Sequence, residues 1–416
     1  MALHPLVRRI GGFAAVPFVG AITPLLLLPV IARVTSVEGW AAVALGQSVG
    51  AVAMIVVTFG WNLSGPSRTA QADDDGRRAL YREALASRLA AFVVVLPVEA
   101  VVAAFLAPEG FRTVAVLMAL AVSATGLSPA WYAIGSGQAR TLLIYDALPR
   151  VAAAVVGAPL LVLGAPLVTY PILLLAASLG TTAVHARKTL GPPSVPGARR
   201  AMRTVADRAT LRILVPDAAS EIASGSYSAG AVALVGLGTG VRELAVFAAG
   251  DRLFRLSLYA ISSLCNALQG WVAEPVDRAT SRHRFRTSLT LHSTVGVVGA
   301  LLIVGAGPWA SGVVFGADLA VDLPTAAGFA VAFLMISLET SVGRHYLIPR
   351  GYRRTYLAAV TSAVVVGVPA LVGFAHLAGA PGGAWAVAAA EGTICLVVLA
   401  AAITVARRAL ELEPAR

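Results

Sequence analysis

One apolar segment of the chain, residues 247–271, carries its polar residues on one side of a helix. Asp251, Arg255, Ser262, Asn266 and Gln269 follow one another at spacings of four, seven, four and three residues, which places them on one face at 3.6 residues per turn. A charged side chain at the centre of a bilayer costs about 2.5–3.5 kcal/mol even on lenient scales, so it normally faces a partner helix or water. We expect this segment to form one wall of a hydrated pathway.

A second stripe lies in residues 213–238. Asp217, Glu221, Ser224 and Ser228 are spaced by four, three and four residues, again on one face. Carboxylates inside a membrane bind protons or cations, or pair with arginines in a gate. Asp217 and Glu221 are therefore candidates for ion coupling or gating, and the alternative is that they lie at the cytoplasmic interface. Three further residues in apolar segments are candidates for the same role: Asp251, Glu339 and Arg344.

Some of these charges have a purely structural explanation. Asp251 and Arg255 are four residues apart and can neutralise each other along the helix. Arg252 is then the better candidate for a cation that faces the pathway. Glu99 and Glu391 are read as groups that form hydrogen bonds between helices rather than as ligands.

Composition places the chain among membrane proteins. Of its 416 residues 58% are hydrophobic and 13% are charged, whereas a soluble chain carries about 25% charged residues. The net charge of +11 fits basic cytoplasmic loops, so we expect no nucleic-acid partner. Two cysteines in apolar runs and six scattered histidines indicate neither a disulfide framework nor a metal site, and we expect no cofactor.

Apolar runs of about 20 residues predict the transmembrane helices. Of the 32 Lys and Arg residues, 27 fall on one side if the N-terminus is inside, so both termini are expected in the cytoplasm of a plasma-membrane, multi-pass protein. Twelve helices are predicted, at residues 11–34, 41–64, 84–106, 112–135, 147–165, 167–185, 213–238, 243–270, 288–307, 325–349, 356–376 and 382–406.

The chain also divides into two similar halves. A Pro/Gly-rich and then basic stretch, residues 186–212, has the composition of a linker, so we predict an N-terminal lobe at 1–198 and a C-terminal lobe at 199–416. Six helices per lobe make the two repeats parallel. The repeated residues are Tyr132, Ile134, Gly137, Arg140, Thr141 and Leu143 with Tyr346, Ile348, Gly351, Arg354, Thr355 and Leu357, and Gly60, Trp61 and Arg68 with Gly270, Trp271 and Arg278.

Several segments resemble oligosaccharide flippases of the polysaccharide transporter family, often called Wzx-type, which belongs to the multidrug/oligosaccharidyl-lipid/polysaccharide exporter superfamily. The first two helices of that family are similar to two segments near the start of this chain, LLLPVIARVTSVEGWAAVALGQS and TFGWNLSGPSRTAQADDDGRR. The second segment has Trp61 where Phe is usual. Three later segments also resemble it: PAWYAIGSGQARTLLIYDALPR, AVFAAGDRLFRL and GAPGGAWAVAAAE.

The resemblance implies two six-helix lobes around a central cavity that opens alternately to each face. The expected cargo is a polyprenyl-diphosphate-linked oligosaccharide, with membrane lipids, H+ or Na+ and glycan assembly enzymes as further partners. Arginine forms forked contacts with phosphate, so Arg252 and Arg255 are the candidates to hold the diphosphate. The residues expected to line the rest of the path are Arg33, Asn62, Asn266 and Gln269.

Other functions remain open at this stage. An ion-coupled drug or metabolite exporter of the same superfamily would share the architecture, as would a major-facilitator-type transporter. A membrane-embedded glycan polymerase or ligase is disfavoured because the outer connections are short and poor in charge. No catalytic triad or nucleotide-binding loop is recognisable, so we expect a transporter driven by a gradient rather than an enzyme.

Overall fold

The computed structural model describes residues 27–192, 214–215, 218, 221–222, 225, 227–273 and 277–411. These residues form helices and connecting turns, with no β-strand among them, and eight of their helices are long and apolar enough to cross a bilayer. The chain separates into two compact units, residues 1–233 and 234–416. The predicted all-α, polytopic membrane fold is confirmed. The predicted lobe boundary at residue 198 falls outside the described residues and stays a prediction.

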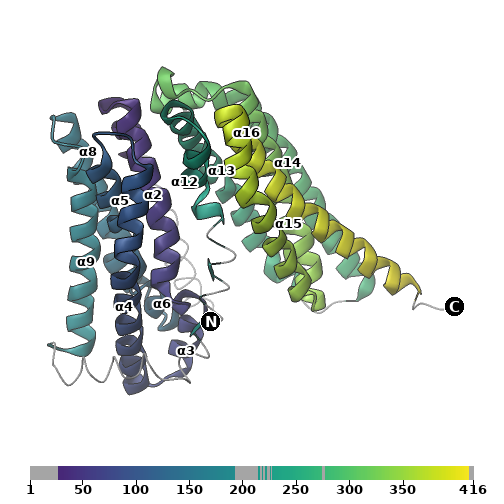
Figure 1. Ribbon diagram of the computed structural model, residues 1–416. Helices are drawn as coiled ribbons and strands as arrows, with labels where there is room; N and C mark the ends of the chain where they lie inside the picture. The colour runs from purple at the N-terminus through teal and green to yellow at the C-terminus, as the bar shows by residue number, and fades with distance from the viewer. Residues whose placement is uncertain are drawn as a thin grey trace. The chain divides into compact units, whose positions relative to one another are not determined.

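The helices of the first unit stand side by side, with α2 packed on α4 and α5, and α9 packed on α4, α5 and α8 (Figure 1). A short helical segment at residues 27–34 precedes them. The elements are α2 (Val37–Thr58), α3 (Trp61–Gln71), α4 (Asp74–Leu106), α5 (Arg112–Ala124), η1 (Thr125–Leu127), α6 (Ala130–Gly135), α7 (Ala139–Leu142), the π-turn η2 (Leu143–Ala147), α8 (Leu148–Val162) and α9 (Thr169–Leu190).

Two glycines allow α2 to lie close against α5. A Cβ atom built on Gly46 would be 2.4 Å from the carbonyl oxygen of Ala115, and one built on Gly50 would be 2.4 Å from that of Ala119. Glycines four residues apart form a groove along one helix face, and this spacing is common where transmembrane helices pack backbone to backbone. The close approach of α2 and α5 therefore depends on the absence of side chains at these two positions.

The second predicted helix is broken near its C-terminal end. Phe59 and Gly60 have left-handed φ angles of 49° and 76°, so α2 stops and α3 starts at Trp61 in a new direction. Trp61 is fully buried, and its ring centroid lies 4.9 Å from that of Trp131. The continuous span predicted at residues 41–64 is wrong at this point, because hydropathy does not report the backbone conformation at a glycine.

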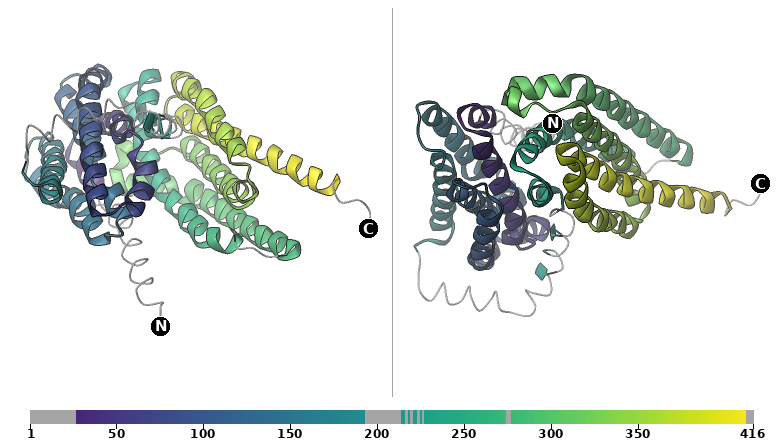
Figure 2. Two further views of the ribbon diagram at one scale, coloured as in Figure 1. Left: turned by 90° about the horizontal axis from the view of Figure 1, so that it is seen from below. Right: turned by 45° about the horizontal axis from the view of Figure 1, so that its top comes forward.

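The second unit is built mainly from four long helices, in which α14 packs on α15 and α15 on α16 (Figures 1 and 2). Its last helical element is broken at Ala378 and Gly379, so it accounts for the two predicted spans 356–376 and 382–406. The elements are α12 (Ala231–Gly238), which crosses the division between the units, α13 (Val241–Ala273), α14 (Arg278–Phe315), η3 (Ala317–Leu319), α15 (Leu323–Val342), the π-turn η4 (Gly343–Leu347), η5 (Ile348–Arg350) and α16 (Arg353–Glu411).

Two aspartates start equivalent helices in the two units. Asp73 accepts a hydrogen bond from the Gly76 amide before α4, and Asp277 accepts one from the Thr280 amide before α14. The hydrogen bonds from Thr280 hold the pKa of Asp277 below its ordinary value. Both helices begin ten residues before the predicted starts at 84 and 288, because the caps extend each apolar run by polar turns.

The predicted internal repeat is visible in the backbone. Gly137 and Gly351 both have left-handed φ angles, 72° and 86°. Each donates its amide to the residue three positions earlier, Ile134 in one unit and Ile348 in the other. The second proposed match differs in conformation, because the helix breaks at Gly60 whereas α13 continues through the equivalent residues.

Candidate functional site

In the first unit one of the predicted carboxylates has a defined partner. The Thr58 hydroxyl donates a hydrogen bond of 2.8 Å to Oε2 of Glu221, at the end of α2. Asp217 lies outside the described residues. Arg33 and Asn62 are exposed, Arg33 in the segment 27–34 and Asn62 at the start of α3. Their roles in the pathway stay predictions.

Arg88 is a buried charge that the sequence did not single out. Its side chain is 3% exposed and donates hydrogen bonds to the carbonyl oxygens of Gly126 and Ser128, the latter at 2.9 Å. These carbonyls belong to the break between α5 and α6, where the helix leaves acceptors without partners. The predicted helix starts at residue 84 and so places Arg88 near its end, whereas α4 begins at Asp74 and Arg88 lies well inside it.

Glu99 has the inter-helix role expected of it. Its Oε1 atom accepts a hydrogen bond of 2.8 Å from the hydroxyl of Ser123, which joins α4 to α5, and the side chain is 3% exposed. Replacement of one partner would leave the other as an unsatisfied polar group in an apolar environment. Glu99 therefore contributes to packing within the unit.

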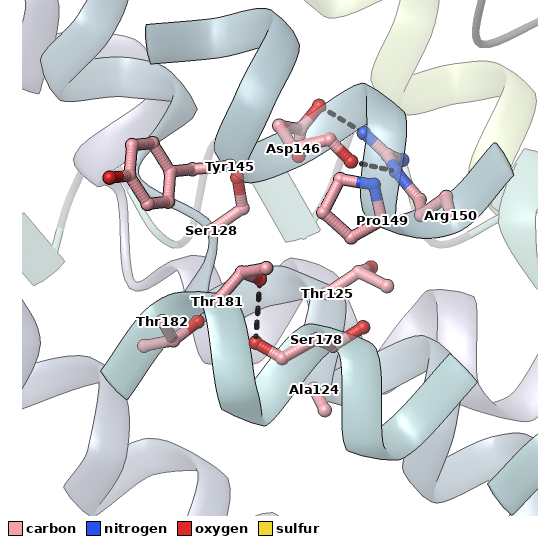
Figure 3. Close-up of a pocket in the computed structure, with 10 residues that line it drawn as sticks. All are labelled: Ala124, Thr125, Ser128, Tyr145, Asp146, Pro149, Arg150, Ser178, Thr181 and Thr182. Atoms are coloured by element: carbon pink, nitrogen blue, oxygen red, sulfur yellow. Dashed lines mark hydrogen bonds and ion pairs between the residues drawn. The ribbon is translucent and has the colours of Figure 1, made fainter. Parts of the chain in front are cut away.

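The first unit encloses a small polar cavity between α5, α8 and α9 (Figure 3). Its volume is about 10 Å³, which is space for a single water molecule. An ion pair between Asp146 and Arg150 forms one side. Hydroxyl groups line the rest, from Thr125, Ser128, Tyr145, Ser178, Thr181 and Thr182. This cavity is too small for a sugar or a drug.

A wider cavity of about 230 Å³ opens between the start of α4, the segment from α6 to η2 and the end of α9. Tyr145 lines both cavities. The other lining residues are Asp74, Arg78, Tyr132, Gln138, Thr141, His185, Lys188 and Thr189. Within the described ranges no group of three or more His, Cys, Asp or Glu side chains is placed to hold a metal ion.

In the second unit the stripe on α13 is divided between buried and exposed positions. Asp251 is 2% exposed, and its Oδ2 atom accepts a hydrogen bond of 2.6 Å from Nε of Arg255. The expected neutralisation along the helix is therefore present. Arg252 is half-buried and Asn266 is exposed. The side chain of Gln269 lies outside the described residues.

A network of polar side chains surrounds the π-turn η4. The Tyr356 hydroxyl interacts with both Glu339 and Arg344, two residues predicted separately as coupling or gating groups. Arg344 also interacts with the Cys265 thiol on α13. Tyr356 was not predicted, because it belongs to a helix that starts after the turn.

Gly343 makes room for this network. A Cβ atom at this position would lie 2.4 Å from Cε2 of Tyr356, so the ring packs directly against the glycine backbone. π-turns widen a helix by one residue and are frequent at functional sites. The turn and the glycine together bring Glu339, Arg344 and Tyr356 into one group.

His345 lies at the centre of this network. His345 is 1% exposed, its Nδ1 atom is 2.6 Å from the Ser288 hydroxyl, and its Nε2 atom is 3.8 Å from the Cys265 sulfur. The signal for this group in the sequence was a histidine directly after Arg344, inside a predicted transmembrane helix. It was passed over because the six histidines show no ligand spacing.

Comparison with known proteins gives a likeness in fold. No family model matches the chain, and no curated protein matches it. The inward-facing conformation of a multidrug resistance MATE family transporter of the MOP superfamily superposes with a TM-score of 0.65 at 17% identity, covering 94% of this chain and 96% of that one. A point mutant of a MATE transporter superposes with a TM-score of 0.50 at 14% identity, covering 93% and 94%. The chain therefore has the fold of these transporters over nearly its whole length.

Proposed function

We propose that the protein is a flippase that moves a polyprenyl-diphosphate-linked oligosaccharide from the cytoplasmic to the outer leaflet by alternating access. The observation that carries the proposal is the charge on α13, where two arginines and one carboxylate lie within five residues of a helix flanked by membrane-spanning segments. The ion pair of Arg255 with Asp251 leaves an excess of one positive charge on this part of the helix. A diphosphate head group is an anion suited to such a site.

The fold supports transport as the general activity, since the superposed structures are transporters. Arg33, Asn62 and Asn266 are exposed, as residues that line a hydrated path would be. Amide side chains suit sugar hydroxyls because each offers both donors and an acceptor. In this proposal the sugar head group crosses through the protein and the polyprenyl tail stays in the lipid.

Arginine replacement tests the proposal. Arg252→Ala is expected to lower glycan export by about tenfold or more, because a charge-assisted hydrogen bond contributes about 1.5–3 kcal/mol. Export is measured as surface glycan in the producing cells, at equal amounts of protein in the membrane. Arg242→Ala is the matched control, because Arg242 is exposed at the start of the same helix. Normal export by Arg252→Ala would contradict the assignment.

The role of Arg255 must be tested in a variant that also changes its ion-pair partner Asp251. Arg255→Ala alone leaves the buried carboxylate of Asp251 without its cation, so folding could fail for electrostatic reasons. The double variant Asp251→Asn with Arg255→Gln keeps the volumes and removes both charges. Loss of export in the double variant, with normal membrane insertion, would assign Arg255 to cargo binding in addition to its structural role.

A drug exporter is the second candidate, because the structure with a TM-score of 0.65 is that of a multidrug transporter. The excess positive charge on α13 would repel cationic drugs and favour anionic or neutral ones. Proteoliposomes that accumulate an anionic or neutral dye under a pH or sodium gradient, and that do not move a polyprenyl-diphosphate lipid, would support the exporter against the flippase.

In this proposal the transport of the cargo is coupled to a gradient of H+ or Na+. Glu339 and Arg344 support this assignment best, because Tyr356 links them and Glu339 is only 7% exposed. Glu221 and Asp217 remain candidates for the same role, and Asp251 is better explained by its ion pair.

A further inference from the structure

The second unit buries two imidazoles close together. His292 on α14 and His345 in η4 are 0% and 1% exposed, and their ring centroids are 5.5 Å apart. Both lie in segments that are long and apolar enough to cross the membrane. Two titratable rings at this depth are unusual, because polar groups in a membrane interior are normally retained for a function.

The two rings differ in their hydrogen bonds. His345 donates from Nε2 to the Cys265 carbonyl oxygen at 3.3 Å, and its Nδ1 then accepts from the Ser288 hydroxyl at 2.6 Å. Neither ring nitrogen of His292 has a hydrogen-bond partner among the described residues. His292 is fixed instead through its backbone, where its carbonyl oxygen accepts a hydrogen bond from Ser337. A buried, unpaired imidazole nitrogen is an open site for a proton.

The repeated architecture places different residues at the equivalent positions of the first unit. Counting from the capping residues Asp73 and Asp277, Ser288 occupies the position of Ala84 and His292 that of Arg88, which is also buried. Counting from Tyr132 and Tyr346, His345 occupies the position of Trp131. In the first unit Ala84 and Trp131 belong to an apolar and aromatic core. At these two positions the second unit carries a hydroxyl and an imidazole in place of apolar groups, and beside them a second imidazole in place of a guanidinium.

We propose that His292 and His345 together form a site that binds one proton, and that this proton is the coupling ion of the transporter. The coupling part of the inference rests on the proposed function. The proton adds to an open nitrogen of the pair and returns to water on the other side of the membrane in the same cycle. Two imidazolium ions at this distance repel each other strongly in a medium of low dielectric constant, so the pair holds one proton and not two.

The surroundings of the pair allow it to respond to the rest of the unit. Arg344 opposes a positive charge on His345. Arg344 also interacts with Tyr356 and Glu339, so a proton on His345 acts on this group through Arg344. The polar groups that contact the pair are Cys265 on α13, Ser288 on α14 and Ser337 on α15. Ser341 contacts Ser288, and Glu339, Thr340, Tyr356 and Cys395 interact with Arg344 or with one another.

Histidine spectroscopy tests the proton site directly. The full chain, labelled with 15N-histidine and placed in lipid nanodiscs, is titrated from pH 8 to pH 5. We expect the two buried imidazoles to share one proton in the wild type, and the remaining ring to take it alone in His292→Gln or His345→Gln. His283→Gln is the control, because His283 is exposed on the same helix as His292. Two neutral rings at pH 5, or two rings that each take a proton independently, would overturn the site.

A conservative variant, Ser288→Ala, tests the site in case the histidine variants do not fold. Ser288→Ala reproduces the residue of the first unit and removes the hydrogen bond to His345. We expect it to alter the tautomer signals of His345 and the pH at which the pair takes its proton. Unchanged signals would show that Ser288 does not hold the ring and would count against the pair as a built site.

A flux measurement separates the coupling from the proposed function. Proteoliposomes with a fluorescent polyprenyl-diphosphate lipid are compared with and without a pH gradient. We expect the gradient to accelerate flux by wild type at least about fivefold and to have no effect on the double variant His292→Gln with His345→Gln. Wild-type flux that ignores the gradient would overturn the coupling. Absence of any wild-type flux would overturn the flippase instead, and the titration would then decide the proton site alone.

Discussion

Trp61 shows how one residue fixes the C-terminal end of the second predicted transmembrane segment. Its indole N–H donates a hydrogen bond of 2.9 Å to Ser87, and the guanidinium of Arg68 lies 4.8 Å from its ring centroid. The resembling family usually has Phe here, which fills a similar volume but has no donor. The substitution of Trp for Phe is thus explained by a polar partner on α4.

Trp61→Phe is expected to lower the free energy of unfolding by about 1 kcal/mol, the typical net value of one hydrogen bond. Ser87 keeps its bonds to the carbonyl oxygens of Glu83 and Ala84, so no unsatisfied group adds to the loss. Thermal unfolding in detergent measures the effect. Ser87→Ala provides the second edge of a double-variant cycle. Strictly additive losses in the two variants would show that the hydrogen bond contributes nothing.

At the scale of elements, α2 and α5 depend on glycine. Gly50→Ala places a Cβ atom 2.4 Å from the Ala119 carbonyl oxygen, so the helices must separate. We expect a loss of about 1–3 kcal/mol, as for other overpacked cores. Gly180→Ala is the matched control: it lies within α9, and its added Cβ atom has nothing within 4 Å. This control should stabilise the protein by about 0.5–1 kcal/mol through helix propensity alone. Equal effects of the two variants in thermal unfolding would refute the packing argument.

The elements were predictable where hydropathy alone defines them. The apolar cores of α4 and α14 were located, but their polar first turns were not, because Asp73 and Asp277 extend each helix beyond the lipid-facing run. The left-handed pair Phe59 and Gly60 was also missed, since its effect depends on backbone angles rather than composition.

The candidate site was predictable only in part for a similar reason. Spacing along one helix identified the Asp251–Arg255 pair correctly. The group around His345 joins α13, α14, α15 and α16, and no spacing within a single helix brings such residues together. Arg88 was missed because the predicted helix starts at residue 84, whereas α4 begins at Asp74 and Arg88 lies well inside it.

At the scale of the whole molecule, the repeat explains why two units of one fold carry different chemistry. The turn at Gly137 recurs at Gly351 with the same hydrogen bonds, whereas the core beside it changes from aromatic in one unit to hydroxyl and imidazole in the other. The two units therefore share a backbone turn and differ in the polar side chains that are buried beside it.

The orientation of this scaffold in the membrane follows from the positive-inside rule and is open to a direct test at the two ends of α9. Leu163 is 82% exposed in the turn before α9, and Lys188 is exposed in its last turn. The native cysteines Cys265 and Cys395 are both buried, so the unmodified chain gives a low background with thiol reagents. In intact cells we expect a membrane-impermeant maleimide to label Leu163→Cys.

Lys188→Cys should react only after the membrane is opened, because the basic end of α9 is retained on the cytoplasmic side. The two variants are controls for each other, since they differ in the end of one helix and share the same exposure to solvent. The opposite pattern would invert the first unit. It would place the wider cavity lined by Lys188 and the N-terminal end of α4 outside the cell, where a cytoplasmic lipid-linked substrate could not first meet them.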